Sequence, residues 1–209
     1  MKKLENIDFL VFDLGNVVID IDYDFSINEL KKKLPTHKHQ LTSDFFPSQF
    51  HKDFEKGLIS AEHFRKEIRG LFEEEIADLE IDHIWNSLLR ELPLERIQLI
   101  QNLRKDYGTA VLSNTNSIHI EKFDKILLET AALHSLAELF DHVFLSHEMG
   151  LSKPDEKIYE KVVEVLGTSP ERILFFDDLE ANLAGAKRVG LQTYHITHPK
   201  ALVEFFQHV

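Results

Sequence analysis

The feature that most constrains this chain is a short apolar run near its start that contains one carboxylate. Residues 9 to 14 read Phe-Leu-Val-Phe-Asp-Leu, so Asp13 is the single polar residue of the run, and Gly15 follows. Such a run predicts a strand buried on both faces of a parallel sheet. Asp13 would then lie near the carboxyl end of the strand, where open α/β sheets bind ligands. Gly15 is expected to permit a sharp turn there. Taken alone, Asp-Leu-Gly is better explained as a turn cap, and only residues far downstream reverse that preference.

Length and composition limit the domain organisation and the function classes that are possible. The chain has 209 residues, a formal net charge of −12 and no cysteine. A length of this order allows one large α/β domain or a core with an insertion. The negative charge argues against a nucleic-acid surface, and the absence of cysteine excludes disulfides and thiolate chemistry. The apolar run after Lys2 and Lys3 is broken by Asp8 and Asp13, so a signal peptide or membrane span is not predicted. We therefore expect a cytoplasmic protein.

The second half of the chain alternates between strand and helix patterns. Short apolar strands are predicted at residues 109–112, 143–145, 173–176 and 192–196, with helices between them. Together with the first strand, this alternation predicts an α/β fold, a doubly wound, Rossmann-like parallel sheet.

The stretch between the first two strands predicts only helices. We expect helices at 27–34, with Ser26 as N-cap, at 43–54, with three phenylalanines on one face, at 61–72, capped by Ser60, and at 76–92. We therefore predict a Rossmann-like core of residues 1–20 and 93–209 and a small inserted helical cap of residues 21–92.

Polar residues recur where the predicted strands end. Asp13 ends the first strand, and Asp177 with Asp178 ends the one at 173–176. Ser113 and Asn114 follow the strand at 109–112, and Lys153 lies beyond the one at 143–145. Each has an ordinary explanation as a turn residue, a helix cap or a surface cation. Because a parallel sheet brings these ends to one edge, their joint occurrence predicts a functional site.

These motifs resemble those of the haloacid dehalogenase-like (HAD) hydrolase superfamily, which consists mostly of Mg²⁺-dependent phosphatases. The matching segments are Asp-Leu-Gly-Asn (13–16), Leu-Ser-Asn-Thr-Asn (112–116), Ser-Lys-Pro-Asp (152–155) and Phe-Phe-Asp-Asp (175–178) with Asn182. Within the superfamily, the chain is most similar to the branch of bacterial sugar-phosphate phosphatases that includes α-glucose-1-phosphatase. The helical stretch falls where the family carries its cap.

The resemblance implies a set of roles. Mg²⁺ would be held by Asp13, the backbone carbonyl of Gly15 and Asp178, and Asp177 would support the site directly or through water. Asp13 would be the nucleophile and would form an aspartyl-phosphate. Ser113, the backbone amides beside it, including that of Asn114, and the catalytic Lys153 would hold the phosphoryl oxygens, and Asn182 would orient the acidic pair. A hard cation is also sensible physically, because several buried carboxylates beside a phosphate need compensation.

One position departs from the family pattern. Most phosphatases of this superfamily have a second aspartate two residues after the nucleophile, which protonates the leaving alcohol, whereas this chain has Gly15. General acid–base catalysis contributes about 10²–10⁴-fold. Turnover is then slow, or the leaving group is an easy one, as in a sugar 1-phosphate, or another group such as Tyr23, His51 or a water substitutes. The sequence does not choose among these.

The resulting prediction is an Mg²⁺-dependent phosphatase that acts on a small sugar phosphate, with α-D-glucose 1-phosphate as one example. Two alternatives stay open: a catalytically weak sugar-phosphate binding or regulatory protein, and a metal-free hydrolase of the dehalogenase type that acts on carbon. The predicted partner is a small phosphorylated molecule, with neither nucleic acid nor membrane. Nothing in the sequence predicts the oligomeric state.

Overall fold

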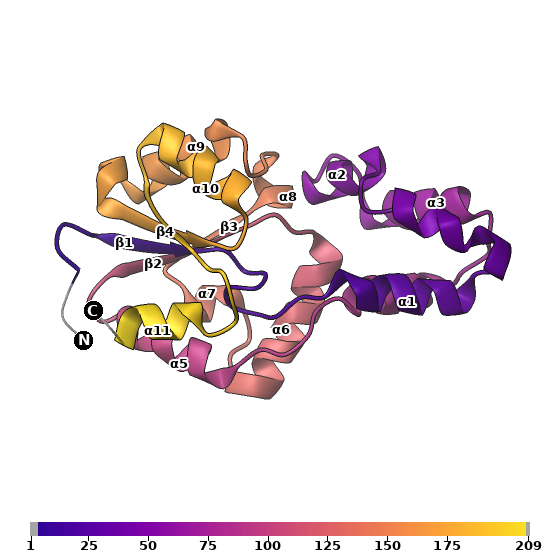
Figure 1. Cartoon of the computed structure of the whole chain (residues 1–209), viewed down its shortest axis with the longest axis horizontal. Coiled ribbons are helices and arrows are strands. Elements are labelled where there is room, and N and C mark those ends of the chain that lie inside the picture. Colours follow the sequence, from indigo (N-terminus) through magenta and orange to yellow (C-terminus); the bar gives the residue numbers. More distant parts are fainter. Residues whose placement is uncertain (1–3, 208–209) are drawn as a thin grey trace.

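The computed structural model describes residues 4–207, and its centre is a sheet of five parallel strands in the order β3-β2-β1-β4-β5 (Figure 1). The strands are β1 (Phe9–Phe12), β2 (Gly108–Ser113), β3 (His142–Leu145), β4 (Ile173–Asp177) and β5 (Gln192–His195). The central strand β1 pairs with β2 on one side and β4 on the other, so Phe12 lies opposite both Val111 and Phe176. The predicted doubly wound α/β fold is confirmed.

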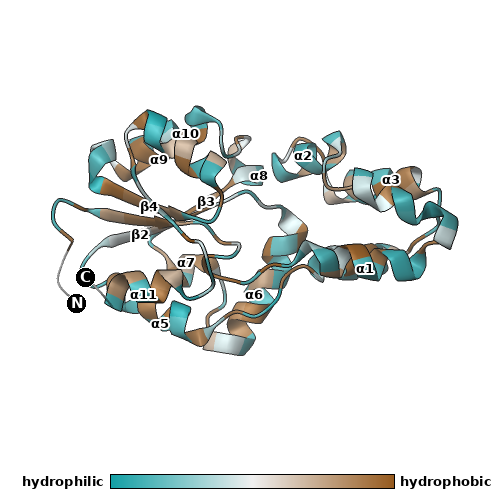
Figure 2. Cartoon of the chain, in the orientation of Figure 1, coloured by the Kyte–Doolittle hydropathy of each residue, from teal (hydrophilic) through white to brown (hydrophobic). Residues whose placement is uncertain are grey.

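Helices cover both faces of this sheet, giving three layers (Figure 1). One face carries α5 (Leu94–Leu103), α6 (Ser117–Ala131), α7 (Leu136–Leu139) and α11 (Ala201–Gln207), and the other carries α9 (Glu156–Leu166) and α10 (Glu180–Val189). Side chains of β1 alternate between two cores: Leu10 and Phe12 pack in one, and Val11 packs in the other. β4 is hydrophobic from Ile173 to Phe176 (Figure 2), as expected of a strand buried on both faces, and ends in Asp177.

A helical lobe extends from one end of the sheet (Figure 1). It contains α1 (Tyr23–Lys33), the 3₁₀ helix η1 (Thr36–Asp44), α2 (Gln49–Glu55), α3 (Ala61–Phe72) and α4 (Asp78–Asn86). Its interior is aromatic: the Phe45 ring lies 5.1 Å from Trp85 and 6.2 Å from Phe64, centroid to centroid. The division of the chain into a core and a cap domain stays a prediction.

The start of α1 differs from the sequence prediction. Asp22, not Ser26, is the N-cap, and its carboxylate accepts a hydrogen bond from the backbone amide of Asp24 at 2.9 Å. Ser26 lies within the helix, is buried, and donates to the Ile84 carbonyl at 2.8 Å. A buried hydroxyl that links two helices cannot be told from a cap by sequence alone. By contrast, the predicted cap of α3 by Ser60 is confirmed.

Three predicted helices are shorter than expected. Residues 43–54 do not form one helix, because η1 ends at Asp44 and α2 begins only after its N-cap Ser48. Helix α4 ends at Asn86, and the chain beyond it pairs with the segment before α1 through an antiparallel bridge of Ile21 and Leu89. After β2, α6 ends at Ala131 and a separate short helix, α7, follows. Tertiary pairing therefore overrides helical periodicity at these boundaries.

The lobe contacts the core near the carboxyl edge of the sheet, through α2 and the residues that follow it. Ser146, at the start of the short helix α8 (Ser146–Met149), donates from its hydroxyl to the Glu55 carbonyl at 2.5 Å. At Gly57 a Cβ atom would lie 2.0 Å from the His147 carbonyl oxygen, so only glycine allows this approach. Helix α2 therefore lies directly against the core. None of the helices in residues 4–207 is long and apolar enough to cross a membrane.

The packing of α9 on α10 gives a stability prediction. An alanine Cβ at Gly185 of α10 would lie 2.5 Å from the Pro154 carbonyl oxygen and 2.9 Å from the Tyr159 ring. We expect Gly185→Ala to lower the free energy of unfolding by about 1–3 kcal/mol, because the backbone of Pro154 cannot move freely. Urea denaturation of the purified variant measures this.

The matched control is Gly70→Ala in α3, where nothing lies within 4 Å of the new Cβ. This substitution should raise the free energy of unfolding by about 0.5–1 kcal/mol through helix propensity alone. Equal gains in the two variants would contradict the close contact at Gly185.

Candidate functional site

Three carboxylates meet at the carboxyl edge of the sheet. Asp13 directly follows β1, and Asp177 is the last residue of the neighbouring strand β4, so strand pairing itself places the two side by side. One carboxylate oxygen from each of Asp13, Asp177 and Asp178 lies within 4.8 Å of the others. The sequence-predicted acids therefore converge in space.

Lys153 lies between two of these acids. Its ammonium nitrogen is 2.7 Å from Asp13 Oδ1 and 2.7 Å from Asp177 Oδ2, and the residue is only 4% exposed. The backbone of Lys153 is held by the Asn114 side chain, whose Nδ2 donates to the Lys153 carbonyl at 2.9 Å and whose Oδ1 accepts from the Lys153 amide at 2.8 Å. Asn114 thus positions Lys153. The predicted substrate contact of its backbone amide stays a prediction.

Asp177 is fully buried and surrounded by donors. Asn182 on α10 donates from Nδ2 to both carboxylate oxygens, at 3.0 and 3.1 Å, and the Leu179 amide donates to Oδ1 at 2.8 Å. With Lys153 on Oδ2, this carboxylate is fixed in one orientation. The sequence-based expectation that Asn182 orients the acidic pair agrees with this contact, although the functional role stays a prediction.

Asp178 is less enclosed, and a residue not assigned from the sequence holds it. Asn16 donates from Nδ2 to Asp178 Oδ2 at 2.9 Å, while its Oδ1 accepts from the Ile21 amide at 3.0 Å. The backbone of Asn16 is left-handed, with φ of 56°. Asparagine tolerates this region better than most residues. That preference is the one signal in the sequence that pointed to a special position.

The same loop corrects one expectation about Gly15. The left-handed residue of the turn is Asn16, and Gly15 is not in that region. A Cβ at position 15 would lie 2.9 Å from Cδ1, the end of the Ile21 side chain. A larger residue at this position therefore requires the Ile21 side chain to move.

The surroundings compensate the acids only in part. The pKa of Asp13 is raised to about 7: burial raises it most, Lys153 lowers it, and Asp177 and Asp178 raise it. Burial likewise raises the pKa of Asp178, against the lowering effect of the Asn16 hydrogen bond. Burial lowers the pKa of Lys153, yet Asp13 and Asp177 raise it more, so the side chain stays an ammonium. One cation among three carboxylates leaves excess negative charge.

The donor set fits a hard divalent cation. Three carboxylates are clustered, two of them are mostly buried, and Mg²⁺ prefers carboxylate and carbonyl oxygens. Because both oxygens of Asp177 already accept hydrogen bonds, Asp13 and Asp178 have more capacity left for a cation. The ligand roles of Asp13, Asp178 and the Gly15 carbonyl stay predictions. Within residues 4–207 this is the one cluster of three or more such side chains.

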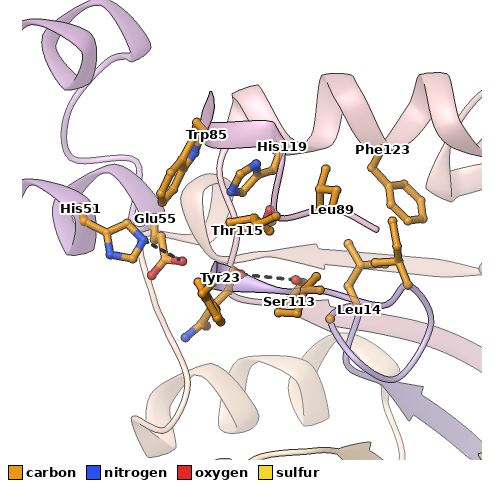
Figure 3. A pocket seen from close by; sticks show the side chains of 15 residues that line it. Leu14, Tyr23, His51, Glu55, Trp85, Leu89, Ser113, Thr115, His119 and Phe123 are labelled. Carbon is orange, nitrogen blue, oxygen red and sulfur yellow. Dashed lines mark hydrogen bonds and ion pairs between the residues drawn. The ribbon is translucent and has the colours of Figure 1, made fainter. Parts of the chain in front are cut away.

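A cavity opens from these carboxylates towards the helical lobe. The core contributes Asp13, Ser113, Lys153 and Asp178 to its lining, and the lobe side contributes Tyr23, His51 and Glu55. Figure 3 shows the adjoining part of the pocket, with Trp85 and His119 beside the His51–Glu55 pair.

Two groups in this lining differ in chemical character. The Ser113 hydroxyl makes only a 3.5 Å contact with the Asn114 carbonyl, which is longer than an ordinary hydrogen bond, so it is available to a ligand. His119 is stacked on Trp85 at 4.7 Å, and burial lowers its pKa to about 3, so the ring is neutral. Glu55 and Trp85 of the lobe and His119 of α6 were not predicted as site residues, because only the docking of the lobe on the core brings the three together.

Comparison with known proteins identifies the family. A family model described as haloacid dehalogenase-like hydrolase matches residues 7–190. The match covers most of the chain and contains all four motifs. The chain therefore belongs to the haloacid dehalogenase-like hydrolases.

Similar proteins narrow the class. The D-ribitol-5-phosphate phosphatase of Bacteroides thetaiotaomicron is 27% identical over 185 residues, which are 88% of this chain and 89% of that protein. A crystal structure of a HAD family enzyme from B. thetaiotaomicron, in complex with magnesium and inorganic phosphate, has a TM-score of 0.83 at 33% identity and covers 90% of this chain and 93% of that chain. The structure of a predicted HAD-like hydrolase from Porphyromonas gingivalis has a TM-score of 0.86 at 30% identity, covering 97% of each chain.

The predictions of family and of enzyme class are thereby confirmed: the chain is a hydrolase of the HAD type, with phosphatases among its relatives. The carboxylate cluster is present in the structure, and a similar structure holds magnesium.

The raised pKa of Asp13 predicts how the stability of the metal-free protein depends on pH. Asp13 binds its proton more tightly in the folded chain, with a pKa of about 7, than at its ordinary value of 3.8. The stability that this proton contributes is present below pH about 4 and is lost as the pH rises through about 7. Asn cannot titrate. Asp13→Asn should therefore become more stable than wild type over this window, by about 1–3 kcal/mol at pH 8.

Urea denaturation in EDTA at a series of pH values measures the difference. Asp44→Asn, at an exposed position of the lobe, is the control and should show no such pH-dependent gain. A difference between Asp13→Asn and wild type that shrinks as the pH rises would contradict the charge imbalance.

Proposed function

We propose that this protein is an Mg²⁺-dependent phosphatase that hydrolyses a small sugar phosphate through an aspartyl-phosphate on Asp13. The observation that carries the proposal is the cluster of Asp13, Asp177 and Asp178, which among residues 4–207 has Lys153 as its one ion-paired cation. Such a cluster is costly to fold. It is sensible where a divalent cation and a phosphoryl group complete the charge balance.

The metal-binding roles follow from which carboxylates are already occupied. Asp13, Asp178 and the Gly15 carbonyl would hold Mg²⁺, and Asp177, fixed by Asn182 and Leu179, would support them. The bound cation would supply charge that stabilises the phosphoryl oxygens. Asn16 keeps Asp178 turned towards Asp13.

The nucleophile and the phosphate-binding groups share one wall of the cavity. Lys153 contacts one oxygen of Asp13 and leaves the other for attack on phosphorus. The ammonium of Lys153 and the hydroxyl of Ser113 both line the cavity and would bind the phosphoryl oxygens. Lys153 thus orients the nucleophile in the free enzyme and offsets phosphoryl charge in the complex.

The substrate assignment rests on the helical lobe. We propose that residues 21–92 act as a cap, since Tyr23, His51 and Glu55 close the cavity opposite the acids. The D-ribitol-5-phosphate phosphatase similar to this chain acts on a sugar-alcohol phosphate. The sequence resemblance to the glucose-1-phosphatase branch supports sugar 1-phosphates as a second group to test. We place the reaction in the cytoplasm, on a small phosphorylated molecule, without nucleic acid or membrane.

The regulatory alternative has one observation in its favour. Position 15 carries no side chain that could protonate a leaving group, and Ile21 fills the adjacent space. A chain that binds sugar phosphates without turnover would show this feature. The metal-free dehalogenase alternative has less support, because clustered carboxylates beside an attacking carboxylate are sensible mainly around a cation.

The decisive experiment is a phosphate-release screen over sugar 1-phosphates and terminal sugar and sugar-alcohol phosphates, with Mg²⁺ or with EDTA. We expect release with Mg²⁺ and none in EDTA. Asp13→Asn should abolish release because it removes the nucleophile. Asp178→Asn should raise the Mg²⁺ concentration needed for half-maximal rate by at least about tenfold, because it removes a ligand.

Three results would contradict the proposal. Activity that survives EDTA would favour the metal-free hydrolase. Binding of sugar phosphate by wild type without any release would favour the regulatory protein. An unchanged rate in Asp13→Asn would show that another group attacks phosphorus.

A further inference from the structure

The loop after β1 lacks a proton donor for the leaving group. Gly15 has no side chain, and the side chain nearest to its absent Cβ is that of Ile21, which carries no proton donor. A phosphate ester of a simple alcohol needs such a donor, because an unprotonated alkoxide is a poor leaving group. A proton donor must therefore come from another residue that lines the cavity, such as those of the helical lobe.

That wall holds a histidine and a carboxylate from one helix. His51 and Glu55 are one turn apart on α2, and His51 Nε2 lies 3.4 Å from Glu55 Oε1 (Figure 3). The other ring nitrogen, Nδ1, is 2.7 Å from the Phe46 carbonyl, which can only accept, so Nδ1 carries a proton. The His51 side chain is 11% exposed, and both residues line the cavity with Asp13 and Lys153.

We propose that His51 is the catalytic acid and base of this enzyme, replacing the side chain missing at Gly15, and that Glu55 is its positioning residue. The inference rests on the proposed phosphatase function. Its consequence for the substrate is that esters of ordinary alcohols, such as sugar and sugar-alcohol phosphates at a terminal carbon, are within reach as well as sugar 1-phosphates.

The contacts of Nε2 suit this role. A separation of 3.4 Å from Glu55 is longer than a strong N–H···O bond, so the proton on Nε2 can pass to an oxygen that enters the cavity. The Glu55 backbone is held by Ser146 of the core, which keeps the pair at the cavity. Helix α2 is thus fixed to the core at its carboxyl end, near the acidic site.

Charged and titratable neighbours favour a protonated ring. Burial lowers the pKa of His51, but the hydrogen bond and charge of Glu55 and the Phe46 carbonyl raise it above its usual value, against a small opposing effect of Lys52. From other elements, Tyr23 and His119 face the same cavity. The net effect is a raised pKa for His51, which favours the protonated ring that general acid catalysis requires.

The other two titratable groups are less suitable. Partial burial and the charges of Glu55, Asp13 and Asp178 raise the pKa of Tyr23 to about 12, so its phenol is a weak acid at neutral pH. Burial lowers the pKa of His119 to about 3, and its Nδ1 contacts Asn86 at 3.0 Å, so it holds no ionisable proton to give.

The proposed reaction has two steps, and His51 ends it in the protonation state in which it began. One oxygen of Asp13 forms a bond to phosphorus while the ester P–O bond breaks, and the departing oxygen takes the proton from His51 Nε2. The product alcohol and a neutral imidazole result. In the second step, Nε2 accepts a proton from water as the water oxygen bonds to phosphorus and the Asp13 carboxylate is released. His51 is then protonated again.

The test compares two leaving groups in His51→Gln. The alkyl substrate is D-ribitol 5-phosphate or, if this is not hydrolysed, the terminal alkyl phosphate that wild type hydrolyses fastest. On this substrate kcat should fall about 100-fold or more. On 4-nitrophenyl phosphate, whose phenolate leaves without protonation, the formation of the aspartyl-phosphate should slow less than about fivefold in a burst measurement. The matched control is His63→Gln, which disrupts a similar pair with Glu67, at 3.1 Å, on the exposed face of α3.

Glu55→Gln tests the pair without removing the ring. The rate on the alkyl phosphate should fall at alkaline pH as His51 loses its proton. Removing the Glu55 charge lowers the pKa of His51, so this alkaline limb should move to lower pH. The burst rate on 4-nitrophenyl phosphate should show no matching shift. A role of Glu55 in folding alone would not move the limb.

Each outcome separates the two proposals. Equal losses on both substrates in His51→Gln, or no loss on either, would overturn the role of His51 and leave the phosphatase intact. An unmoved alkaline limb in Glu55→Gln would also overturn it. A wild type that releases no phosphate from either substrate with Mg²⁺ would instead contradict the phosphatase function, and the inference would fall with it.

Discussion

The placement of one buried ammonium between two buried carboxylates governs the architecture of this protein. Lys153 contacts Asp13 and Asp177 at 2.7 Å each, and the three residues come from three separate parts of the chain. Removing one partner of a buried pair leaves an uncompensated charge. The three chain segments must therefore be positioned together, because a misplaced one would leave a buried charge unpaired. Hydrogen bonds from Asn114 to Lys153 and from Asn182 to Asp177 fix these positions.

The same interaction leaves the site incomplete. Burial raises the pKa of Asp13, Lys153 lowers it, and Asp177 and Asp178 raise it, so that it lies at about 7 in the protein alone. One lysine does not balance three clustered carboxylates. Structures with unsatisfied charge persist where function requires them. In the proposed function, a bound cation and a bound phosphoryl group would balance this charge and stabilise the folded protein.

Features that depend on residues close in sequence were predictable, and features that depend on contacts between distant residues were not. The strands and the acids at their ends were predictable, because hydrophobic runs are local and a parallel sheet brings its carboxyl ends together. The limits of the lobe helices were not, since Ser26 bonds Ile84 and Ile21 pairs with Leu89 across the lobe. The His51–Glu55 pair is visible as a spacing, but its place at the cavity depends on the docking of α2.

The position of the proposed proton donor links specificity to chemistry. A proton donor in the loop beside the nucleophile would protonate the leaving group of any ester that binds at the phosphate site. His51 instead lies on the lobe that forms the far wall, next to Trp85 and Tyr23. The groups that contact the alcohol part of the substrate then also position the atom that protonates it. A poorly fitting alcohol would lose proton transfer as well as binding, and discrimination would appear in kcat and not only in KM.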